Sequence, residues 1–305
     1  MLNLIDYLPV LYDQEDKKDA PKRCGPFITQ LKKRGKIIGF SHPVSETHFI
    51  YYKSYIRMKT KGNTIFITGG NAGIGLALAE IFLKEGNTVI ICGRNEQKLQ
   101  EVSSRLPEIH TEACDISKAE ERTSLAERLL NKYPGLNVLV NNAGIQQRFN
   151  FLKTPLSWED YRKEIATNLD APLHLISLLL PHLVKQSDAA ILNVSSALAF
   201  APMAAAPVYC ATKAALHNFT ISLRYQLSET SVEVIEIIPP MVNTNLGGAG
   251  LHLNAVSPEE FAGGVLKGLE NGIREIGYGT SEKAMLMSRE ESDNIVKMLN
   301  TRIPY

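Results

Sequence analysis

The stretch Thr68-Gly69-Gly70-Asn71-Ala72-Gly73-Ile74-Gly75 decides the fold because of what stands on either side of it. Residues 63–68 form a β-branched and aromatic run typical of a buried strand, and residues 73–85 repeat apolar side chains at helical spacing. Glycines at such a junction let the backbone turn sharply and approach a pyrophosphate, which rests on the free N–H groups of the helix start. A tight turn without a ligand is the alternative. We expect cofactor contacts from Gly69, Asn71, Gly73, Ile74 and Gly75.

Strand and helix patterns alternate along the rest of the chain. Apolar runs of strand length at 88–92, 109–114, 138–141, 189–194, 232–238 and 275–278 are separated by helical patterns at 96–106, 118–132, 158–184, 208–227 and 258–269. The pattern over 158–184 is expected to bend near Pro172. Strands without polar alternation are buried on both faces, so the chain is predicted to form a parallel sheet of about seven strands with helices on both sides. With right-handed crossovers this is a doubly wound, Rossmann-type α/β domain over residues 58–305.

Residues 1–57 depart from this pattern. Basic clusters such as Lys32-Lys33-Arg34 and four prolines interrupt any regular period. The N-terminus lacks the basic start followed by an apolar run that marks a secretory signal. We expect a poorly ordered N-terminal extension, or an upstream start that the cell does not use.

The composition excludes several classes of protein. A net charge of +1, with 44% hydrophobic and 21% charged residues, is ordinary for a globular protein and gives no support for nucleic acid as a partner. No run reaches the ~18 apolar residues of a membrane span. The cysteines form neither a C-x-x-C motif nor a cluster with histidine, which predicts reduced thiols in a cytoplasmic protein without a metal site.

The end of the second predicted strand bears on the choice of cofactor. A carboxylate some ~20 residues after the glycines would bind the ribose 2′-hydroxyl of NAD(H). Here Arg94 stands at that place and no acid precedes Glu96. A guanidinium suits a 2′-phosphate, so NADP(H) is favoured over NAD(H); a solvated arginine at a helix start is the alternative. After the third strand, Asp115 is expected to bind the adenine amino group and Ile116 to cover the ring, although Asp115 could also cap the next helix.

Four motifs in this order resemble the short-chain dehydrogenase/reductase family, in its single-domain branch. They are the glycine stretch, Asn141-Asn142-Ala143-Gly144, a serine after the fifth strand, and Tyr209-x-x-x-Lys213. The resemblance runs from about Lys59 to the C-terminus, and within the family it is nearest to the DltE-type oxidoreductases. One departure is Pro240 in the loop after the sixth strand, where the family has glycine; it stiffens the loop and removes an N–H group. The resemblance implies catalytic Asn168, Ser196, Tyr209 and Lys213, and cofactor contacts from Asn142, Ala143, Gly144, Tyr209, Lys213, Val242 and Thr244.

The chemistry rests on two of these side chains. Tyr209 and Lys213 are four residues apart on a predicted helix and therefore share a face. A nearby ammonium favours phenolate, so we expect a Tyr209 pKa below its ordinary ~10. Tyr209 would then exchange a proton with an alcohol or carbonyl while a hydride moves between the substrate and a nicotinamide. The resemblance implies that Lys213 also holds the nicotinamide ribose, that Ser196 rather than Ser195 binds the substrate oxygen, and that Asn168 holds a water.

The sequence constrains the substrate and the alternative functions less than it constrains the fold. A small-molecule carbonyl or alcohol is expected, in a mostly apolar pocket whose residues could also be ordinary core. The family's helices that correspond to 171–184 and 208–227 pair subunits, which implies a homodimer or homotetramer. A non-catalytic NAD(P)-binding redox sensor should lack Tyr209 or Lys213, and an epimerase or dehydratase on this fold should carry more than the roughly 60 residues that follow Thr244 here. The pocket candidates are Gln146, Ala197, Leu198, Phe200, Met203, Met241 and Leu246.

Overall fold

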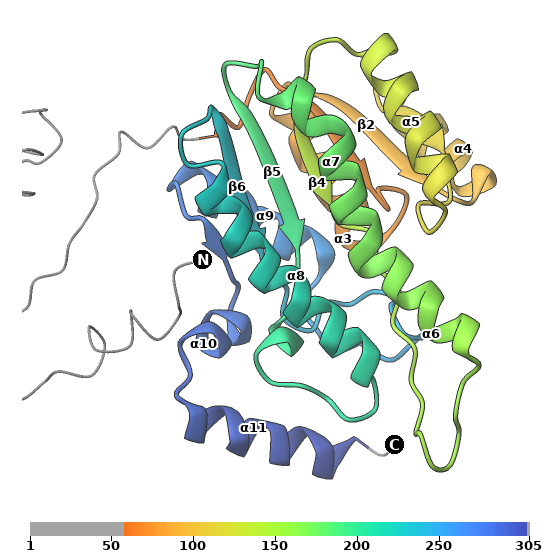
Figure 1. Cartoon of the computed structure of the whole chain (residues 1–305), viewed down its shortest axis with the longest axis vertical. Helices are drawn as coiled ribbons and strands as arrows, with labels where there is room; N and C mark the ends of the chain where they lie inside the picture. Colours follow the sequence, from red (N-terminus) through yellow and green to blue (C-terminus); the bar gives the residue numbers. More distant parts are fainter. Residues whose placement is uncertain (1–57, 304–305) are drawn as a thin grey trace, which may run out of the picture. The chain divides into compact units, whose positions relative to one another are not determined.

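The central feature is a single sheet of seven parallel strands in the order β3-β2-β1-β4-β5-β6-β7 (Figure 1). The computed structural model describes residues 58–303, so the predictions made for residues 1–57 lie outside it. The predicted doubly wound Rossmann-type sheet is confirmed. Its strands are β1 (Thr64–Thr68), β2 (Thr88–Gly93), β3 (His110–Ala113), β4 (Leu136–Asn141), β5 (Ala189–Val194), β6 (Val232–Ile237) and β7 (Glu275–Ile276).

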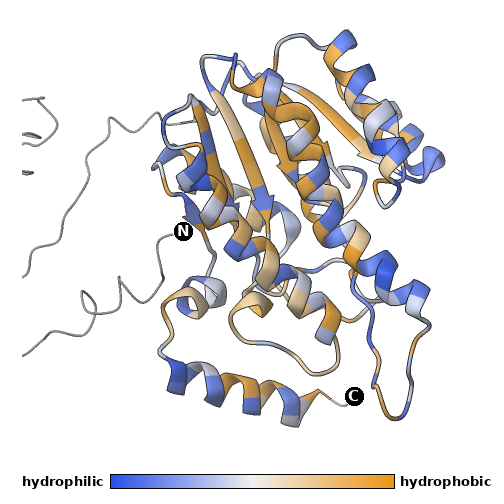
Figure 2. Ribbon diagram, viewed as in Figure 1, coloured by the Kyte–Doolittle hydropathy of each residue, from blue (hydrophilic) through white to orange (hydrophobic). Residues whose placement is uncertain are grey.

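Helices cover both faces of the sheet. On one face lie α3 (Gly73–Lys84), α4 (Glu96–Arg105) and α9 (Pro258–Glu270), and on the other lie α5 (Ala119–Lys132), α7 (Ala171–Leu183) and α8 (Pro207–Gln226). Alternate residues of each strand enter the two cores, as Ile65 and Phe66 do, because successive side chains of a strand point to opposite faces. Figure 2 shows the same division, with apolar strands inside and polar helix surfaces outside. Each such fully buried side chain stabilises the fold by about 1.5–3 kcal/mol.

The predicted helix over 158–184 is three elements. Helix α6 (Trp158–Ile165), which Ser157 caps, passes into a π-helical turn, η2 (Ala166–Asp170), and then into α7. The irregularity lies just before Pro172, which lacks the N–H group that a regular helical hydrogen bond would need. Single π turns are often found at functional sites, and this one carries Asn168.

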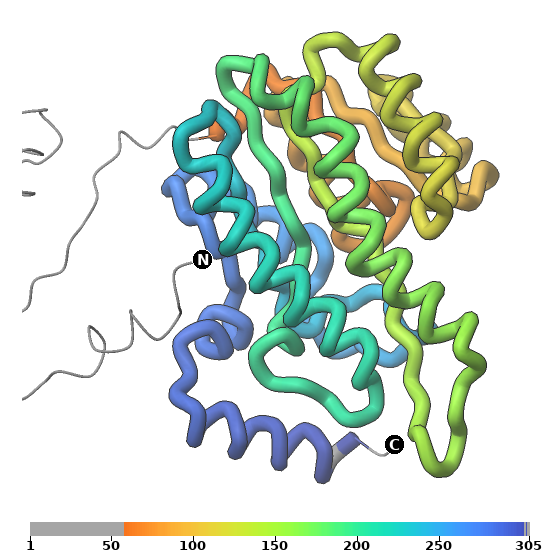
Figure 3. Tube along the Cα trace, viewed as in Figure 1, coloured from red at the N-terminus to blue at the C-terminus, as the bar shows by residue number. Residues whose placement is uncertain are grey.

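Two C-terminal helices escaped the sequence analysis. They are α10 (Thr280–Leu286) and α11 (Arg289–Arg302), and β7 is shorter than predicted. Figure 3 shows α11 beside the loop that leads from β5 into α8. Asn300 Oδ1 accepts a hydrogen bond from Ala204 N at 2.6 Å, and Ser292 Oγ donates to the carbonyl of Phe200 at 2.9 Å. The sequence carried a signal for α11, the capping box of Ser288 and Glu291.

The strand order reverses between β1 and β4. Chain connections leave these two neighbouring strands in opposite directions, so their carboxyl ends flank a crevice where ligands bind in folds of this kind. The first ends at Thr68, at the glycine stretch, and the second at Asn141, at the N-N-A-G motif. Over residues 58–303, no helix is both long and apolar enough to cross a membrane.

Candidate active site

The glycine turn after β1 presents backbone groups. Gly69 and Gly73 have φ angles of 65° and 54°, which side chains other than glycine rarely adopt. Helix α3 starts behind Ala72 with no side-chain cap and no acidic residue in its first turn. By contrast, Asn95, Ser157, Ser257 and Ser288 cap α4, α6, α9 and α11. Free N–H groups and the positive end of the helix dipole therefore meet at α3, an arrangement that fits a phosphate.

The N-N-A-G motif holds this turn in place. Thr68 Oγ1 accepts hydrogen bonds from the backbone N–H groups of Asn142 and Ala143, both at 3.0 Å, and Asn142 Nδ2 donates to Thr68 O at 2.9 Å. A Cβ atom at Gly75 would lie 2.4 Å from both Gly69 O and Asn142 Nδ2. The two motifs are thus held together by hydrogen bonds and close packing. The Asn142 side chain has a structural role beside the predicted cofactor turn.

The end of β2 lies next to the same turn. Asn71 packs against Gly93, where a Cβ would approach its Oδ1 to 2.7 Å. Arg94 is exposed, and its charge acts on Asp115. Burial raises the pKa of Asp115, but hydrogen bonds from Ser117 and the nearby cations outweigh it, so the pKa lies below its ordinary value. An exposed cation at Arg94 and a carboxyl with a lowered pKa at Asp115 therefore lie near each other beside the glycine turn.

One expectation at the end of β3 needs correction. Asp115 does not cap α5: the N-cap is Lys118, and Asp115 Oδ1 instead accepts from Ser117 N and Ser117 Oγ at 3.1 and 2.8 Å. Such a turn is a common alternative for Asp before a helix. The Ile116 side chain packs in the core on the α5 face with 7% of its surface exposed, and its contact with an adenine ring stays a prediction.

The four predicted catalytic residues come from three elements. Tyr209 and Lys213 lie on α8, Ser196 follows β5, and Asn168 lies in the π turn. The exposed fraction of each is 8% or less. Lys213 Nζ donates to Val194 O at 2.8 Å and lies 5.6 Å from the centroid of the Tyr209 ring. The hydroxyl of Ser196 lies near enough to Tyr209 to lower its pKa, whereas Ser195 Oγ is buried with no partner. The structure therefore brings Ser196, rather than Ser195, to the tyrosine.

The expected lowering of the Tyr209 pKa is wrong for this structure. Burial raises the pKa of the phenol well above its ordinary value, and the Ser196 hydrogen bond opposes that rise only in part. Burial also lowers the pKa of the Lys213 ammonium, to about 8. The prediction counted the attraction of the two groups and left out desolvation, which disfavours both charged forms.

Asn168 ties the loop after β4 to α8. Its Oδ1 accepts from Ile145 N at 2.9 Å, and its Nδ2 donates to Ile145 O and Thr212 Oγ1 at 2.8 and 3.2 Å. Both amide protons are engaged, so a water held by this side chain would bind the second lone pair of Oδ1. Gly144 faces this group: a Cβ there would lie 3.4 Å from Asn168 Oδ1 and 3.6 Å from Lys213 Nζ.

The loop after β6 reaches across to the glycine turn. Thr244 lies over the start of α3, where a Cβ on Gly73 would be 3.1 Å from its Cγ2, and Val242 packs into the core beside Val256. Ile74, like Gly73, belongs to the first turn of α3 and packs against the same core.

The predicted pocket residues divide into two groups. Met203 belongs to an apolar cluster with Tyr209, and Leu198 and Leu246 pack against it. Gln146 turns toward Gly247, with its Oε1 buried and unpartnered. Ala197 begins the short helix η3 (Ala197–Ala199), Met241 is largely exposed, and Phe200 packs edge-on against His217. Met203, Leu198 and Leu246 thus lie around Tyr209, and a pocket role for Gln146, Ala197, Met241 and Phe200 stays a prediction.

Sequence reasoning missed three buried carboxyl groups, those of Glu164, Glu233 and Glu236. Glu164 lies one helical turn before Asn168; its Oε1 accepts from Gln147 N at 3.1 Å, and burial raises its pKa to about 7. Glu236 lies in β6 beneath α8. The signal was an acid within an apolar strand, V-E-V-I-E-I, where a charge needs a partner. Over residues 58–303, no group of three or more His, Cys, Asp or Glu side chains could hold a metal ion.

Comparison with known proteins identifies relatives of this chain. The family model for short chain dehydrogenases matches residues 63–250. The uncharacterized oxidoreductase DltE of Bacillus subtilis is 48% identical over 250 residues, which cover 80% of this chain and 99% of that protein. An uncharacterized oxidoreductase of Staphylococcus saprophyticus is 33% identical, covering 60% of this chain and 79% of the relative.

Solved structures with the same architecture include complexes with both nicotinamide dinucleotides. A short chain dehydrogenase from Burkholderia cenocepacia in complex with NADP superposes with a TM-score of 0.69 at 25% identity, covering 79% of this chain and 99% of that one. A short chain dehydrogenase/reductase from Burkholderia phymatum in complex with NAD has a TM-score of 0.68 at 19% identity, covering 81% and 98%, and shows the shared fold.

Proposed function

Since this chain belongs to the short-chain dehydrogenase family, and is an oxidoreductase of the DltE type, we propose that it reduces a small carbonyl compound with Tyr209 as the proton donor. The observation that carries the proposal is the buried group of Tyr209, Lys213 and Ser196 at the carboxyl end of β5. It supplies a proton donor, a cation and a hydroxyl within one small volume, beside the glycine turn.

The cofactor that fits this chain is NADP(H), with NAD(H) as the alternative. The uncapped start of α3 would hold the pyrophosphate, and Arg94 would meet a 2′-phosphate. The similar Burkholderia cenocepacia protein was solved in complex with NADP. Thr244 lies over the turn and would contact the nicotinamide half together with the backbone at Val242. When bound, the reduced nicotinamide supplies the hydride.

Tyr209 suits proton donation. Because burial raises its pKa, the phenol keeps its proton at neutral pH and can give it to a carbonyl oxygen that gains negative charge. The Lys213 ammonium and the Ser196 hydrogen bond then stabilise the phenolate that is left. Ser196 would also hold the carbonyl oxygen, and Asn168 fixes the loop that faces Lys213. In the reverse reaction the same phenolate would accept the proton of an alcohol.

The surroundings of Tyr209 favour an apolar substrate. Met203, Leu198 and Leu246 pack with the tyrosine, and Ile303 after α11 joins them. A small neutral carbonyl compound with an apolar substituent would match this cluster. We also propose a cytoplasmic homodimer or homotetramer; light scattering of the purified chain would test the assembly.

The experiment that tests the function is a panel of aldehydes and ketones with NADPH or NADH, followed at the nicotinamide absorbance. We expect turnover of small apolar carbonyl compounds, and a fall in kcat of about 10³-fold in Tyr209→Phe. NADPH binding, measured by fluorescence, should be retained in that variant. The matched control is Tyr225→Phe, at an exposed tyrosine on the same helix. Cofactor binding without turnover by the native chain would favour a redox sensor instead.

A further inference from the structure

A buried row of polar side chains crosses the middle of the sheet beneath α8. Asn141, Asn193 and Glu236 are neighbours in the register of β4, β5 and β6, so they share one face. Asn141 Nδ2 donates to Asn193 Oδ1 at 2.9 Å, and Asn193 Nδ2 donates to Thr220 Oγ1 of α8 at 3.0 Å. Each is at most 2% exposed, and the hydrophobic core on this face of the sheet packs around them. Glu236 is the fully buried ionisable member of the row, and its register neighbour Glu275 on β7 is partly exposed and pairs with Arg224.

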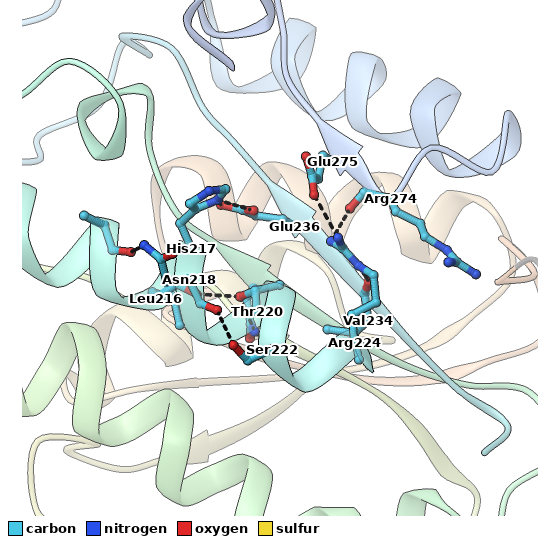
Figure 4. Close-up of polar contacts among 12 residues, drawn as sticks. Leu216, His217, Asn218, Thr220, Ser222, Arg224, Val234, Glu236, Arg274 and Glu275 are labelled. Carbon is cyan, nitrogen blue, oxygen red and sulfur yellow. Dashed lines mark hydrogen bonds and ion pairs between the residues drawn. The ribbon is translucent and has the colours of Figure 1, made fainter. Parts of the chain in front are cut away.

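Glu236 meets α8 through a histidine. His217 Nδ1 lies 2.8 and 3.1 Å from the two carboxylate oxygens, and Figure 4 shows the ring of His217 turned from α8 toward Glu236 on β6. The pKa of His217 is raised, first by this hydrogen bond. The imidazole is half-buried, while the carboxylate is fully buried. A buried carboxylate requires compensation, and a single histidine supplies a full positive charge only when protonated.

Lys213 lies one helical turn before His217 on the same face of α8. Its Nζ donates to the carbonyl of Val194, the residue after Asn193, which is the register partner of Glu236. The lysine is therefore anchored next to the strand position that faces Glu236. Burial lowers the pKa of the ammonium, and the carboxylate of Glu236 acts against that fall.

We propose that Glu236 is a positioning residue for the reaction, the buried counter-ion that keeps Lys213 protonated, and that His217 holds its carboxylate in place. The proposal rests on the proposed function for its catalytic meaning. It explains why a strand of apolar residues carries a fully buried acid beneath the catalytic helix. A purely structural role, a link between α8 and β6 through His217, would leave the titration of Lys213 unaffected by Glu236.

The other titratable groups around this site come from neighbouring elements. On α8 itself, Tyr209 lies one turn before Lys213, with Cys210 beside it. From α6, the carboxyl of Glu164 acts on Tyr209 and Cys210. Around His217, Glu275 of β7 and Arg224 of α8 pair with each other at 2.8 Å. Glu236 is the carboxylate that acts on Lys213.

The test is a titration of Lys213 in the full chain without cofactor, by NMR of lysine labelled at 13Cε and assigned by its loss in Lys213→Arg. The wild-type midpoint should lie at about 8. Glu236→Gln, which keeps the shape and removes the charge, should lower the midpoint by at least about one pH unit. Glu236→Asp, which retracts the charge, should lower it by less. An unchanged midpoint in both variants would overturn the proposal.

The matched control is His217→Gln, which keeps a donor for the carboxylate. Its midpoint should stay within about 0.3 pH units of the wild type. A fall as large as that in Glu236→Gln would show that packing rather than the charge of Glu236 governs Lys213, and would also overturn the proposal. Thermal denaturation of each variant identifies any that fail to fold, and the milder Glu236→Asp then decides.

Turnover provides the second readout. In carbonyl reduction, the decline of kcat at alkaline pH should begin about one pH unit lower in Glu236→Gln, since Lys213 loses its proton earlier. The NMR titration needs no turnover, so the two proposals fail separately. If the chain has no turnover but the Lys213 midpoint depends on Glu236, the proposed function is refuted and the role of Glu236 as counter-ion is retained. If turnover is normal but the Lys213 midpoint does not depend on Glu236, the proposed function is retained and the role of Glu236 as counter-ion is refuted.

Discussion

The proposed nucleotide half of the crevice and its proposed catalytic half are built from different chemical groups. After β1, the groups turned toward a ligand are backbone N–H groups at an uncapped helix, framed by glycines. At the end of β5 they are buried side chains, Tyr209, Lys213 and Ser196, whose charges depend on their surroundings. A backbone site is sensitive to added atoms, whereas a side-chain site is sensitive to desolvation and counter-charges. The two halves should therefore fail in different ways.

Lys213→Met is expected to give the largest difference between the loss of turnover and the loss of cofactor binding. Removal of the ammonium should lower kcat about 10³-fold, since the phenolate of Tyr209 loses its cation, while a phosphate site at α3 is untouched. The NADPH dissociation constant should rise less than about 10-fold. Steady-state kinetics and fluorescence titration measure the two effects. The exposed Lys267→Met on α9 should change neither, and a loss of NADPH binding as large as the loss of kcat would mean that the halves are not separable.

Glu164→Gln tests desolvation on the catalytic side. The folded pKa of about 7 lies above the ordinary 4.5, so this carboxyl contributes stability that is fully present below pH ~4.5 and is lost as the pH rises through about 7. Glutamine does not titrate. Between pH 4.5 and pH 8, the unfolding free energy of the wild type should therefore fall by about 3 kcal/mol more than that of the variant. Urea denaturation at both pH values measures this difference. Parallel pH dependences of the two proteins would show that Glu164 does not titrate in this range.

Gly75→Ala tests the backbone half. Its Cβ would meet Gly69 O and Asn142 Nδ2 at 2.4 Å, so the interlocked motifs must separate. We expect NADPH binding to weaken about 100-fold, with a loss of about 1–3 kcal/mol of stability. Gly86→Ala is the matched control, because Gly86 has a φ of 80° but open space around it. It should cost about 1 kcal/mol of stability and leave NADPH affinity unchanged. Equal NADPH affinities in the two variants would refute the steric argument.

The smallest effect is expected from Arg94→Asp. The guanidinium at the end of β2 should favour a 2′-phosphate through a charge-assisted hydrogen bond, so the ratio of kcat/KM for NADPH over NADH should fall about 10-fold. Lys98→Asp, on the exposed face of α4, is the control and should leave the ratio unchanged. If both variants change the ratio equally, only the general charge of this surface matters, and the preference for NADP(H) loses its basis.

The sequence was most informative where function depends on short-range spacing. The glycine turn after β1 and the single face of Tyr209 and Lys213 follow from local geometry, and the structure has both. The π turn at Asn168 was less predictable, because it depends on how α6 and α7 pack on their neighbours. Helix α11 was missed despite its capping box, since it packs on a loop rather than on the sheet.

The sequence by itself determined the fold class, the cofactor turn and the order of the motifs, because backbone conformation and hydrophobic period are set by residues close together in the chain. Only the tertiary structure decided the environment of the predicted catalytic groups: the hydrogen bonds of Thr68 with Asn142, the acid of β6 beneath α8, and the raised pKa of Tyr209. These properties depend on desolvation and on contacts between residues far apart in sequence, and both arise only when the sheet and its helices have packed.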